Sequence, residues 1–208
     1  GGDNRDRMNA DCMKFIELAL RQEDIVGRRI LEAGSLDVNG SVRPRIESCK
    51  PAEYIGADIA PGKSVDVICD VTRLVDRFGP DSFDIVISTE LLEHVRDWRS
   101  AIHNIKAVCR PGGMILITTR SRGFLYHGYP HDFWRYEPED MRLIFGDCII
   151  EKIERDPEKG VFIKAIKPER FIERNLSGCA LFSVIVGMKV KRIDTWVEKL
   201  WKFLNNYD

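Results

Sequence analysis

The sequence predicts an α/β fold of three layers, with a doubly wound, mostly parallel sheet between two layers of helices. Two observations predict it. Short apolar runs alternate with segments of helical periodicity, and no internal repeat or long linker interrupts them. Alternation of this kind is typical of parallel strands joined by crossover helices. A chain of 208 residues suits one such domain, and we expect its core at about residues 28–168.

The spacing of apolar residues predicts each element in chain order. Strands are predicted at 29–33, 53–58, 65–69, 83–88, 114–119, about 148–154 and 161–166. Helices are predicted at 6–22, within 41–49, and at 71–78, 97–109 and 137–145. A turn is expected at 111–113, where proline precedes two glycines. In the C-terminal extension, 169–208, apolar residues from Ile193 to Leu204 share one face of an amphipathic helix.

Two strand ends predict a site for a cofactor that contains ribose. The strand at 29–33 leads into Gly34, and the next strand ends at Asp58, 24 residues later. Glycine lets the backbone approach a ligand, and the N-terminus of the helix that follows offers free N–H groups. The carboxylate of Asp58 can accept hydrogen bonds from both ribose hydroxyls.

The loop after Gly34 favours a cofactor without phosphate. Dinucleotide sites use G-x-G-x-x-G, but Leu36 stands here at the second glycine, and Asp37 adds a negative charge. S-adenosylmethionine carries no phosphate and is not disfavoured in this way. A nicotinamide enzyme is the weaker alternative, and a turn that binds no ligand is the other.

Composition limits the classes of partner. The formal net charge is −1, so no global basic field for nucleic acid exists, and no nucleic-acid partner is expected. Six scattered cysteines without a C-x-x-C pair argue against zinc and favour a reducing compartment. No signal peptide opens the chain, and its longest apolar stretch, 180–188, is too short to cross a bilayer. We therefore expect a cytoplasmic protein without a membrane span.

Taken in order, these segments resemble a class I (Rossmann-like) S-adenosylmethionine-dependent methyltransferase, most closely the small-molecule "type 11" group. The resemblance covers roughly residues 28–168 and is carried by Ile30–Gly34, Tyr54–Asp58, Cys69–Val71, Phe83–Val95 and Arg110–Ile117. It implies a seven-stranded sheet whose last strand is antiparallel. It also implies S-adenosylmethionine as cofactor and S-adenosylhomocysteine as product.

The resemblance assigns cofactor contacts by position. Facing the methionine part would be Glu32, Gly34 and the loop to Gly40, with Ser35 and Asn39. Asp58 would hold the ribose, with Ile59 beside it, and Asp70 would accept from the adenine amino group, with Val71 beside it. Ser88, Thr89 and Glu90, just past the strand at 83–88, would lie near the methyl group. The family usually has Gly-x-Gly, whereas this chain has Gly34-Ser35-Leu36.

The acceptor side is expected in residues 123–136, because loops at the carboxyl ends of parallel strands carry function. His131 is the candidate general base, and His94 is the second candidate. Candidates for binding the acceptor are His127, Tyr129, Trp134 and Arg135. In the alternative interpretation this segment is a structural cap, with Arg135 paired to Asp132 or Glu137. A metal at His127 and His131 lacks an evident third ligand, so no metal is predicted.

The predicted function is methyl transfer from S-adenosylmethionine to an oxygen or nitrogen of a small molecule. This reaction needs mainly positioning and the exclusion of water, so the family has no fixed catalytic constellation to search for. The alternative is a non-catalytic, cofactor-binding protein of the same fold that docks another protein through its C-terminal helix. The apolar face of this helix, with its two tryptophans, is expected to dock on the domain itself, and a homodimer through the C-terminal region is the alternative.

Overall fold

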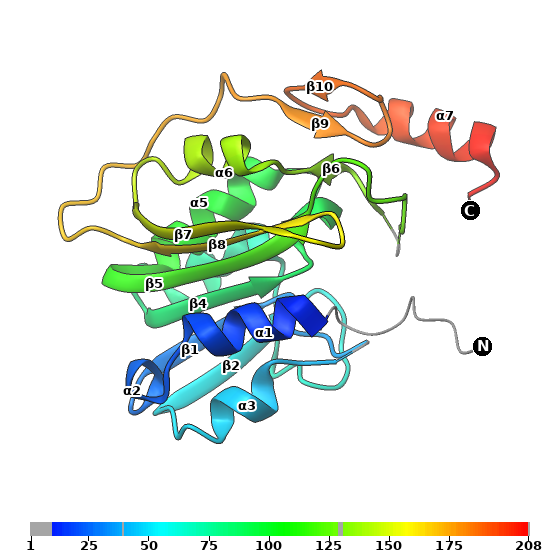
Figure 1. The fold of residues 1–208 in the computed structure, drawn as a ribbon. Coiled ribbons are helices and arrows are strands. Elements are labelled where there is room, and N and C mark those ends of the chain that lie inside the picture. Colours follow the sequence, from blue (N-terminus) through cyan, green and yellow to red (C-terminus); the bar gives the residue numbers. More distant parts are fainter. Residues whose placement is uncertain (1–9, 39, 129–130, 208) are drawn as a thin grey trace.

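The structure, a computed structural model, describes residues 10–38, 40–128 and 131–207 and confirms the predicted fold class. Seven strands form one sheet in the order β3-β2-β1-β4-β5-β8-β7 (Figure 1). The strands are β1 (Arg29–Ala33), β2 (Glu53–Asp58), β3 (Val67–Ile68), β4 (Phe83–Thr89), β5 (Cys109–Arg120), β7 (Ile149–Asp156) and β8 (Gly160–Ile166). Only β8 runs antiparallel to its neighbours in this sheet, as the family resemblance implied.

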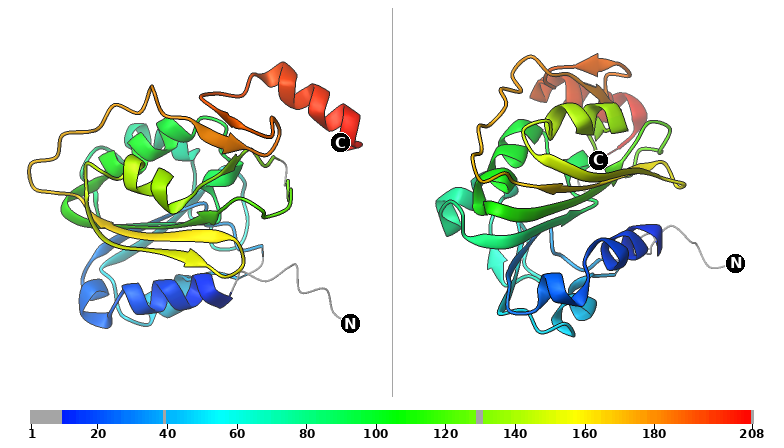
Figure 2. Two further views of the ribbon diagram at one scale, coloured as in Figure 1. Left: turned by 45° about the horizontal axis from the view of Figure 1, so that its top comes forward. Right: turned by 60° about the vertical axis from the view of Figure 1, so that its left-hand side comes forward.

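Helices cover both faces of the sheet (Figures 1 and 2). One face carries α1 (Ala10–Ala19), α2 (Gln22–Ile25) and α3 (Arg43–Glu47). The other carries the short turn η2 (Val71–Arg73), α4 (Leu74–Phe78), α5 (Trp98–Val108) and α6 (Pro138–Ile144). Asp97 accepts a hydrogen bond from the backbone of Ser100 and so begins α5 as expected. Residues 6–9 of the predicted first helix, with Asn39 and Tyr129, lie outside the described residues.

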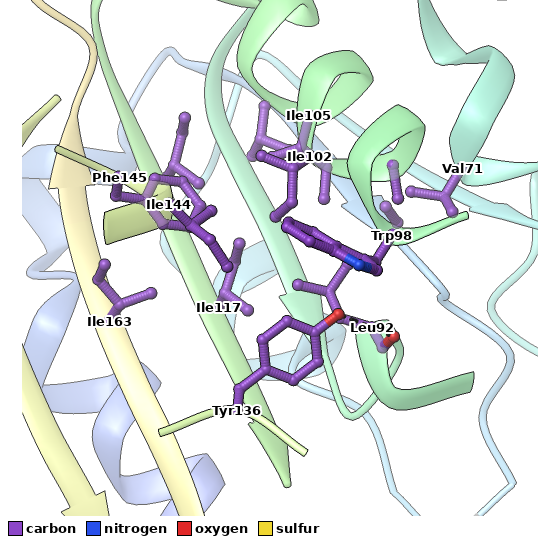
Figure 3. Close-up of a cluster of buried hydrophobic side chains, with 14 of the residues drawn as sticks. Val71, Leu92, Trp98, Ile102, Ile105, Ile117, Tyr136, Ile144, Phe145 and Ile163 are labelled. Carbon is purple, nitrogen blue, oxygen red and sulfur yellow. Dashed lines mark hydrogen bonds between the residues drawn. The ribbon is translucent and has the colours of Figure 1, made fainter. Parts of the chain in front are cut away.

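Alternate residues of the central strands divide into two cores. Ile30, Ile85 and Leu116 pack with α1, whereas Leu31 and Val86 pack with α5 on the opposite face. Because side chains alternate across a strand, continuous apolar runs bury both faces of a parallel sheet. Figure 3 shows the second core. There Trp98, Ile102 and Ile105 of α5 lie over Ile117 of β5, and Tyr136 closes the cluster.

Two strands of the C-terminal extension pair with β6 to form a second, small sheet that the sequence analysis did not predict. Its order is β10-β9-β6, from β6 (Trp134–Arg135), β9 (Leu181–Ser183) and β10 (Lys189–Val190). The last element, α7 (Thr195–Asn205), follows it on the same side of the molecule (Figure 1). Two- and three-residue strands carry too little periodicity to be read from sequence, and these pair across about fifty residues. Within the described part of the chain, no helix is both long and apolar enough to cross a membrane.

The predicted turn at 111–113 lies inside β5 as the structure bounds it. Pairing with β4 shifts its register between Phe83 and Ile85, and Gly112 has a φ of +72°. The regular ladder therefore begins at Met114, where the strand was expected.

Candidate active site

The candidate site lies along the carboxyl ends of the central parallel strands. In the ladder Ala33 pairs with Ser88, and Ser88 pairs with Ile117, so β1, β4 and β5 end side by side. Gly34 follows β1 with a φ of +78°, and its N–H donates to the carbonyl of Ala57 at 2.8 Å. A Cβ on Gly34 would meet the side chain of Leu91 at 3.0 Å. Both the backbone conformation and the crowding therefore require glycine at this turn.

Glu32 lies buried beneath this turn. The hydroxyl of Tyr54 donates to its carboxylate at 2.6 Å. Burial raises the pKa of Glu32 to about 7, although the hydrogen bond from Tyr54 acts in the opposite direction. Near neutral pH this carboxyl can therefore change charge when a cation, such as the ammonium of an amino acid, comes beside it.

Asp58 connects the loop after β1 with the loop after β2. Its carboxylate accepts from the backbone N–H groups of Leu36 and Ala60, each at 3.1 Å. Next to it, Ile59 is exposed and lines a groove of about 450 Å³. Asp70 lines the same groove and accepts from the backbone N–H and hydroxyl of Thr72, both at 2.8 Å. Ile59, which was predicted beside the ribose, and Asp70, which was predicted for the adenine, thus border one groove.

Two buried hydroxyls at this edge lack partners. The Oγ atoms of Ser35 and Ser88 make no hydrogen bond to any described residue. Orphaned buried hydroxyls are rare, so a polar ligand at this edge would satisfy them.

The other predicted cofactor residues are held within the protein. Val71 belongs to the core, and Gly40 donates its N–H to Asp37 at 2.8 Å. Asp37 also pairs with Lys63 at 2.6 Å, so its charge is a weaker argument against a pyrophosphate than the sequence suggested.

Glu90 directly follows the end of β4, and its backbone lies in the left-handed region, with a φ of +52°. This conformation is unusual for a residue with a Cβ and is common at functional sites. Its N–H donates to the carbonyl of Thr118 at 2.9 Å, and its carboxylate pairs with Arg120. Burial and the neighbouring charge of Glu93 raise the pKa of Glu90 well above its usual range. Thr89 is also buried here.

Glu93, which was not among the predicted site residues, lies beside two of the predicted histidines. It belongs to the short turn η3 (Leu92–His94), is fully buried, and accepts from the hydroxyl of Thr119 at 2.7 Å. Its Oε1 lies 3.7 Å from Nε2 of His127 and 3.9 Å from Nε2 of His94. Burial opposes the charge of Glu93, but His127, His94 and Thr119 hold its pKa below the usual range. The Glu90–Glu93 spacing after β4 is the signal that could have found it.

The two histidines beside Glu93 are held by their other ring nitrogens. Nδ1 of His94 lies 2.5 Å from the carbonyl oxygen of His131, and Nδ1 of His127 lies 2.9 Å from Asp132. Burial would lower the pKa of His127, but Asp132 and Glu93 raise it to about 9. His94 and His127 therefore meet at one buried carboxylate.

Trp134 and Arg135 are turned into the protein. Arg135 is buried and forms a two-pronged ion pair with Asp132, at 2.5 and 2.7 Å. The indole of Trp134 donates to the carbonyls of Val95 and Arg96, both at 3.1 Å. The geometry does not support the prediction that these two side chains bind the acceptor, because their polar groups are already used. They act as the cap described by the alternative interpretation.

His131 faces a different way from the other two histidines. Its Nδ1 contacts the carboxylate of Glu198 on α7, and its ring stacks on Phe133 with centroids 5.4 Å apart. Arg96 also pairs with Glu198, so the helix and the loop share one buried acid. The predicted base is thus oriented by the C-terminal helix.

The sheet order is that of the class I (Rossmann-like) methyltransferase fold, as the motifs predicted. A family model described as a methyltransferase domain, Methyltransf_23, matches residues 5–146, and the chain belongs to this family.

One curated relative and two solved structures illustrate the likeness. Ubiquinone biosynthesis O-methyltransferase of Idiomarina loihiensis is 25% identical over 129 residues, which are 56% of this chain and 51% of the relative. The chain spans about half the length of the curated relatives that it matches. An S-adenosylmethionine-dependent methyltransferase from Mesorhizobium loti superposes with a TM-score of 0.60 at 16% identity, over 76% of this chain and 99% of the other.

The second structure is 1,6-didemethyltoxoflavin-N1-methyltransferase of Burkholderia thailandensis, with bound 1,6-didemethyltoxoflavin and S-adenosylhomocysteine. Its TM-score is 0.58 at 16% identity, over 79% of this chain and 80% of that one. At these identities the structural likeness concerns the fold.

Proposed function

We propose that this protein transfers the methyl group of S-adenosylmethionine to an oxygen or nitrogen of a small molecule. One observation carries the proposal: the unpartnered hydroxyls of Ser35 and Ser88 lie on the same strand edge as the buried acid–histidine cluster at Glu93. Methyl transfer to a protonated acceptor needs a cofactor site next to groups that can accept a proton, and this edge of the sheet offers both. The names of the curated relatives, which are O-methyltransferases, support an oxygen acceptor.

In this proposal Asp58 holds the ribose, and Asp70 and Ile59 border the adenine. Glu32 faces the methionine ammonium, while Ser35 and Ser88 satisfy polar groups of the cofactor. When bound, S-adenosylmethionine supplies an electrophilic methyl group on a sulfonium leaving group. The acceptor's lone pair forms a bond to the methyl carbon while the carbon–sulfur bond breaks, and its electrons return to sulfur.

A hydroxyl acceptor must also lose its proton. We assign this role to His131 because the contact of its Nδ1 with the Glu198 carboxylate makes Nδ1 the donor, which leaves Nε2 free to accept a proton. The pairing of an imidazole with an orienting carboxylate is the arrangement that activates histidine bases in other enzymes. His94 is the second candidate for the same role.

Calorimetry and an acceptor panel test this function. The purified protein should bind S-adenosylmethionine and S-adenosylhomocysteine at one site, and a panel of phenols, alcohols and amines should contain a methylated product. Binding without turnover on the whole panel would favour the non-catalytic alternative. Failure to bind either cofactor would contradict both.

We also propose that the protein works in a reducing cytoplasm, since all six cysteines are free thiols.

We further propose that α7 pairs with α7 of a second copy. Four apolar side chains are exposed on this helix: Trp196, Leu200, Phe203 and Leu204. Burial of such an apolar surface in a symmetric pair would stabilise a dimer. Sedimentation of the wild-type protein and of Phe203→Lys tests this: the variant should be monomeric, and a monomeric wild-type protein would contradict the dimer.

A further inference from the structure

The cluster at Glu93 has the composition of a metal site. Oε1 of Glu93 and one ring nitrogen each of His94 and His127 lie within 4.8 Å of one another. Two imidazoles and one carboxylate are a donor set that binds zinc in catalytic sites and suits other divalent transition metals. We propose that these three side chains bind one divalent transition-metal ion. The sequence analysis weighed only a metal at His127 and His131 and found no third ligand; the proposed set is a different one, in which Glu93 and His94 join His127.

The spacing of the ligand atoms is close to what a metal requires. With bonds of about 2.1 Å, tetrahedral ligands lie roughly 3.4 Å apart. Oε1 of Glu93 lies 3.7 and 3.9 Å from the two Nε2 atoms, and all three ligand atoms lie within 4.8 Å of one another, so the histidines must move inward to close the set. Both imidazoles are partly exposed and can make this movement, whereas Glu93 is fixed in the core.

The surrounding groups orient both histidines for coordination. Nδ1 of His94 is directed at the carbonyl of His131, and Nδ1 of His127 is directed at Asp132. The contact of His94 places the hydrogen on Nδ1 and turns Nε2 towards Glu93, whereas His127, with a pKa of about 9, must release a proton when its Nε2 binds the metal. Metal-ligating histidines almost always have such a carbonyl or carboxylate partner on the second nitrogen. Asp132 is itself held by Arg135, so the outer partners are rigid.

The buried carboxylate also has unused capacity. One oxygen of Glu93 accepts from Thr119, whereas Oε1 is buried and accepts no hydrogen bond from any described residue. An unsatisfied buried carboxylate oxygen is costly, and a cation would remove that cost. This observation is independent of the histidine geometry and points to the same occupant.

Three protein ligands leave at least one coordination position for water or substrate, as in catalytic zinc sites. If the proposed function is correct, a hydroxyl oxygen of the acceptor would take this position, and the metal would lower the pKa of that hydroxyl. The role in methyl transfer rests on the proposed function, whereas the binding of the metal does not.

Titration with Co²⁺ and Zn²⁺ tests the site without any methyl acceptor. The chelator-treated wild-type protein should bind one equivalent of Co²⁺, with visible absorption bands of nitrogen and oxygen ligation, and Zn²⁺ should displace it. His94→Gln, His127→Gln and Glu93→Gln should each weaken binding by more than about 100-fold, since loss of an outer partner alone costs 10–100-fold. His103→Gln is the matched control because His103 is an exposed histidine that pairs with Glu173.

X-ray absorption of the zinc-loaded wild-type protein reports the ligands without any mutation, should a variant fail to fold. Imidazole and oxygen scattering is the expected result. Absence of saturable Co²⁺ binding, a thiolate band from a cysteine site, or full binding by both folded histidine variants would each overturn the proposal. Calorimetry with S-adenosylhomocysteine on the same samples measures cofactor binding independently. A failure of the metal proposal can therefore be distinguished from a failure of the proposed function.

Discussion

At the scale of single residues, the site depends on carboxylates whose surroundings differ. Asp58 is partly exposed and accepts from two backbone N–H groups, whereas Glu32 is buried with a single hydroxyl donor. The first is organised as an anion that accepts hydrogen bonds. The second can gain or lose a proton near neutral pH because burial opposes its charge. Each environment leads to a separate prediction.

Asp58→Ala should weaken binding of S-adenosylhomocysteine by about 2–3 kcal/mol, because charged hydrogen bonds contribute roughly 1.5–3 kcal/mol each and are not fully additive. Calorimetry measures the change. Thermal unfolding of the ligand-free variant checks that the loops at Leu36 and Ala60 remain in place. Unchanged affinity in a folded variant would remove the ribose role of this residue.

Glu32 should make stability depend on pH. Its pKa rises from 4.5 to about 7 on folding, so between these values the folded state keeps a proton that the unfolded state releases. Its contribution is therefore fully present below pH 4.5 and is lost as pH rises through 7, by about 3 kcal/mol. Urea unfolding of the wild type and Glu32→Gln should differ in this window. The exposed Glu17→Gln should behave as the wild type, and identical profiles for all three would refute the shift.

At the scale of elements, a buried ion pair between Asp132 and Arg135 holds the described part of the segment after β5. Arg135 lies on the two-residue strand β6 and binds Asp132, and its guanidinium also donates to the carbonyl of Leu125 at 3.0 Å. Asp132 in turn holds His127. The described residues of the aromatic-rich segment, 123–128 and 131–136, therefore combine buried side chains with one histidine, His127, that lies beside Glu93.

Arg135→Leu should destabilise the protein by about 3–5 kcal/mol, because removal of one partner leaves a buried charge unpaired. Arg142→Leu is the matched control: this arginine is exposed on α6 and its pair with Glu139, at 3.8 Å, should contribute less than about 1 kcal/mol. Denaturant unfolding measures both. Equal effects would mean that the ion pair does not hold the cap.

At the scale of the whole molecule, the last helix contacts the segment in which the acceptor is expected to bind. Glu198 of α7 contacts His131 and Arg96, which lie 67 and 102 residues earlier in the chain. Trp201 of the same helix packs on Tyr126, with ring centroids 4.6 Å apart. The C-terminal extension is thus tied to the loop that carries the candidate base.

His131→Ala should lower turnover about 10²–10⁴-fold, the usual contribution of a general base, while affinity for S-adenosylhomocysteine stays nearly constant. Glu198→Gln should lower turnover less, because the imidazole remains. Steady-state kinetics with the acceptor found in the panel measures both effects. Full activity of a stable His131→Ala variant would eliminate this base and shift the role to His94.

Sequence alone determined the sheet, the glycine turn and the acid-tipped strands, because each is a local pattern of apolar period, glycine and carboxylate. Tertiary structure decided the acceptor side. Glu93 lies beside His127 because η3 packs against the loop of His127, and Arg135 points into the core because it pairs with Asp132. The small sheet and the contact of Glu198 with His131 join segments far apart in the chain. Such pairings depend on three-dimensional proximity and burial, which local sequence periodicity does not report.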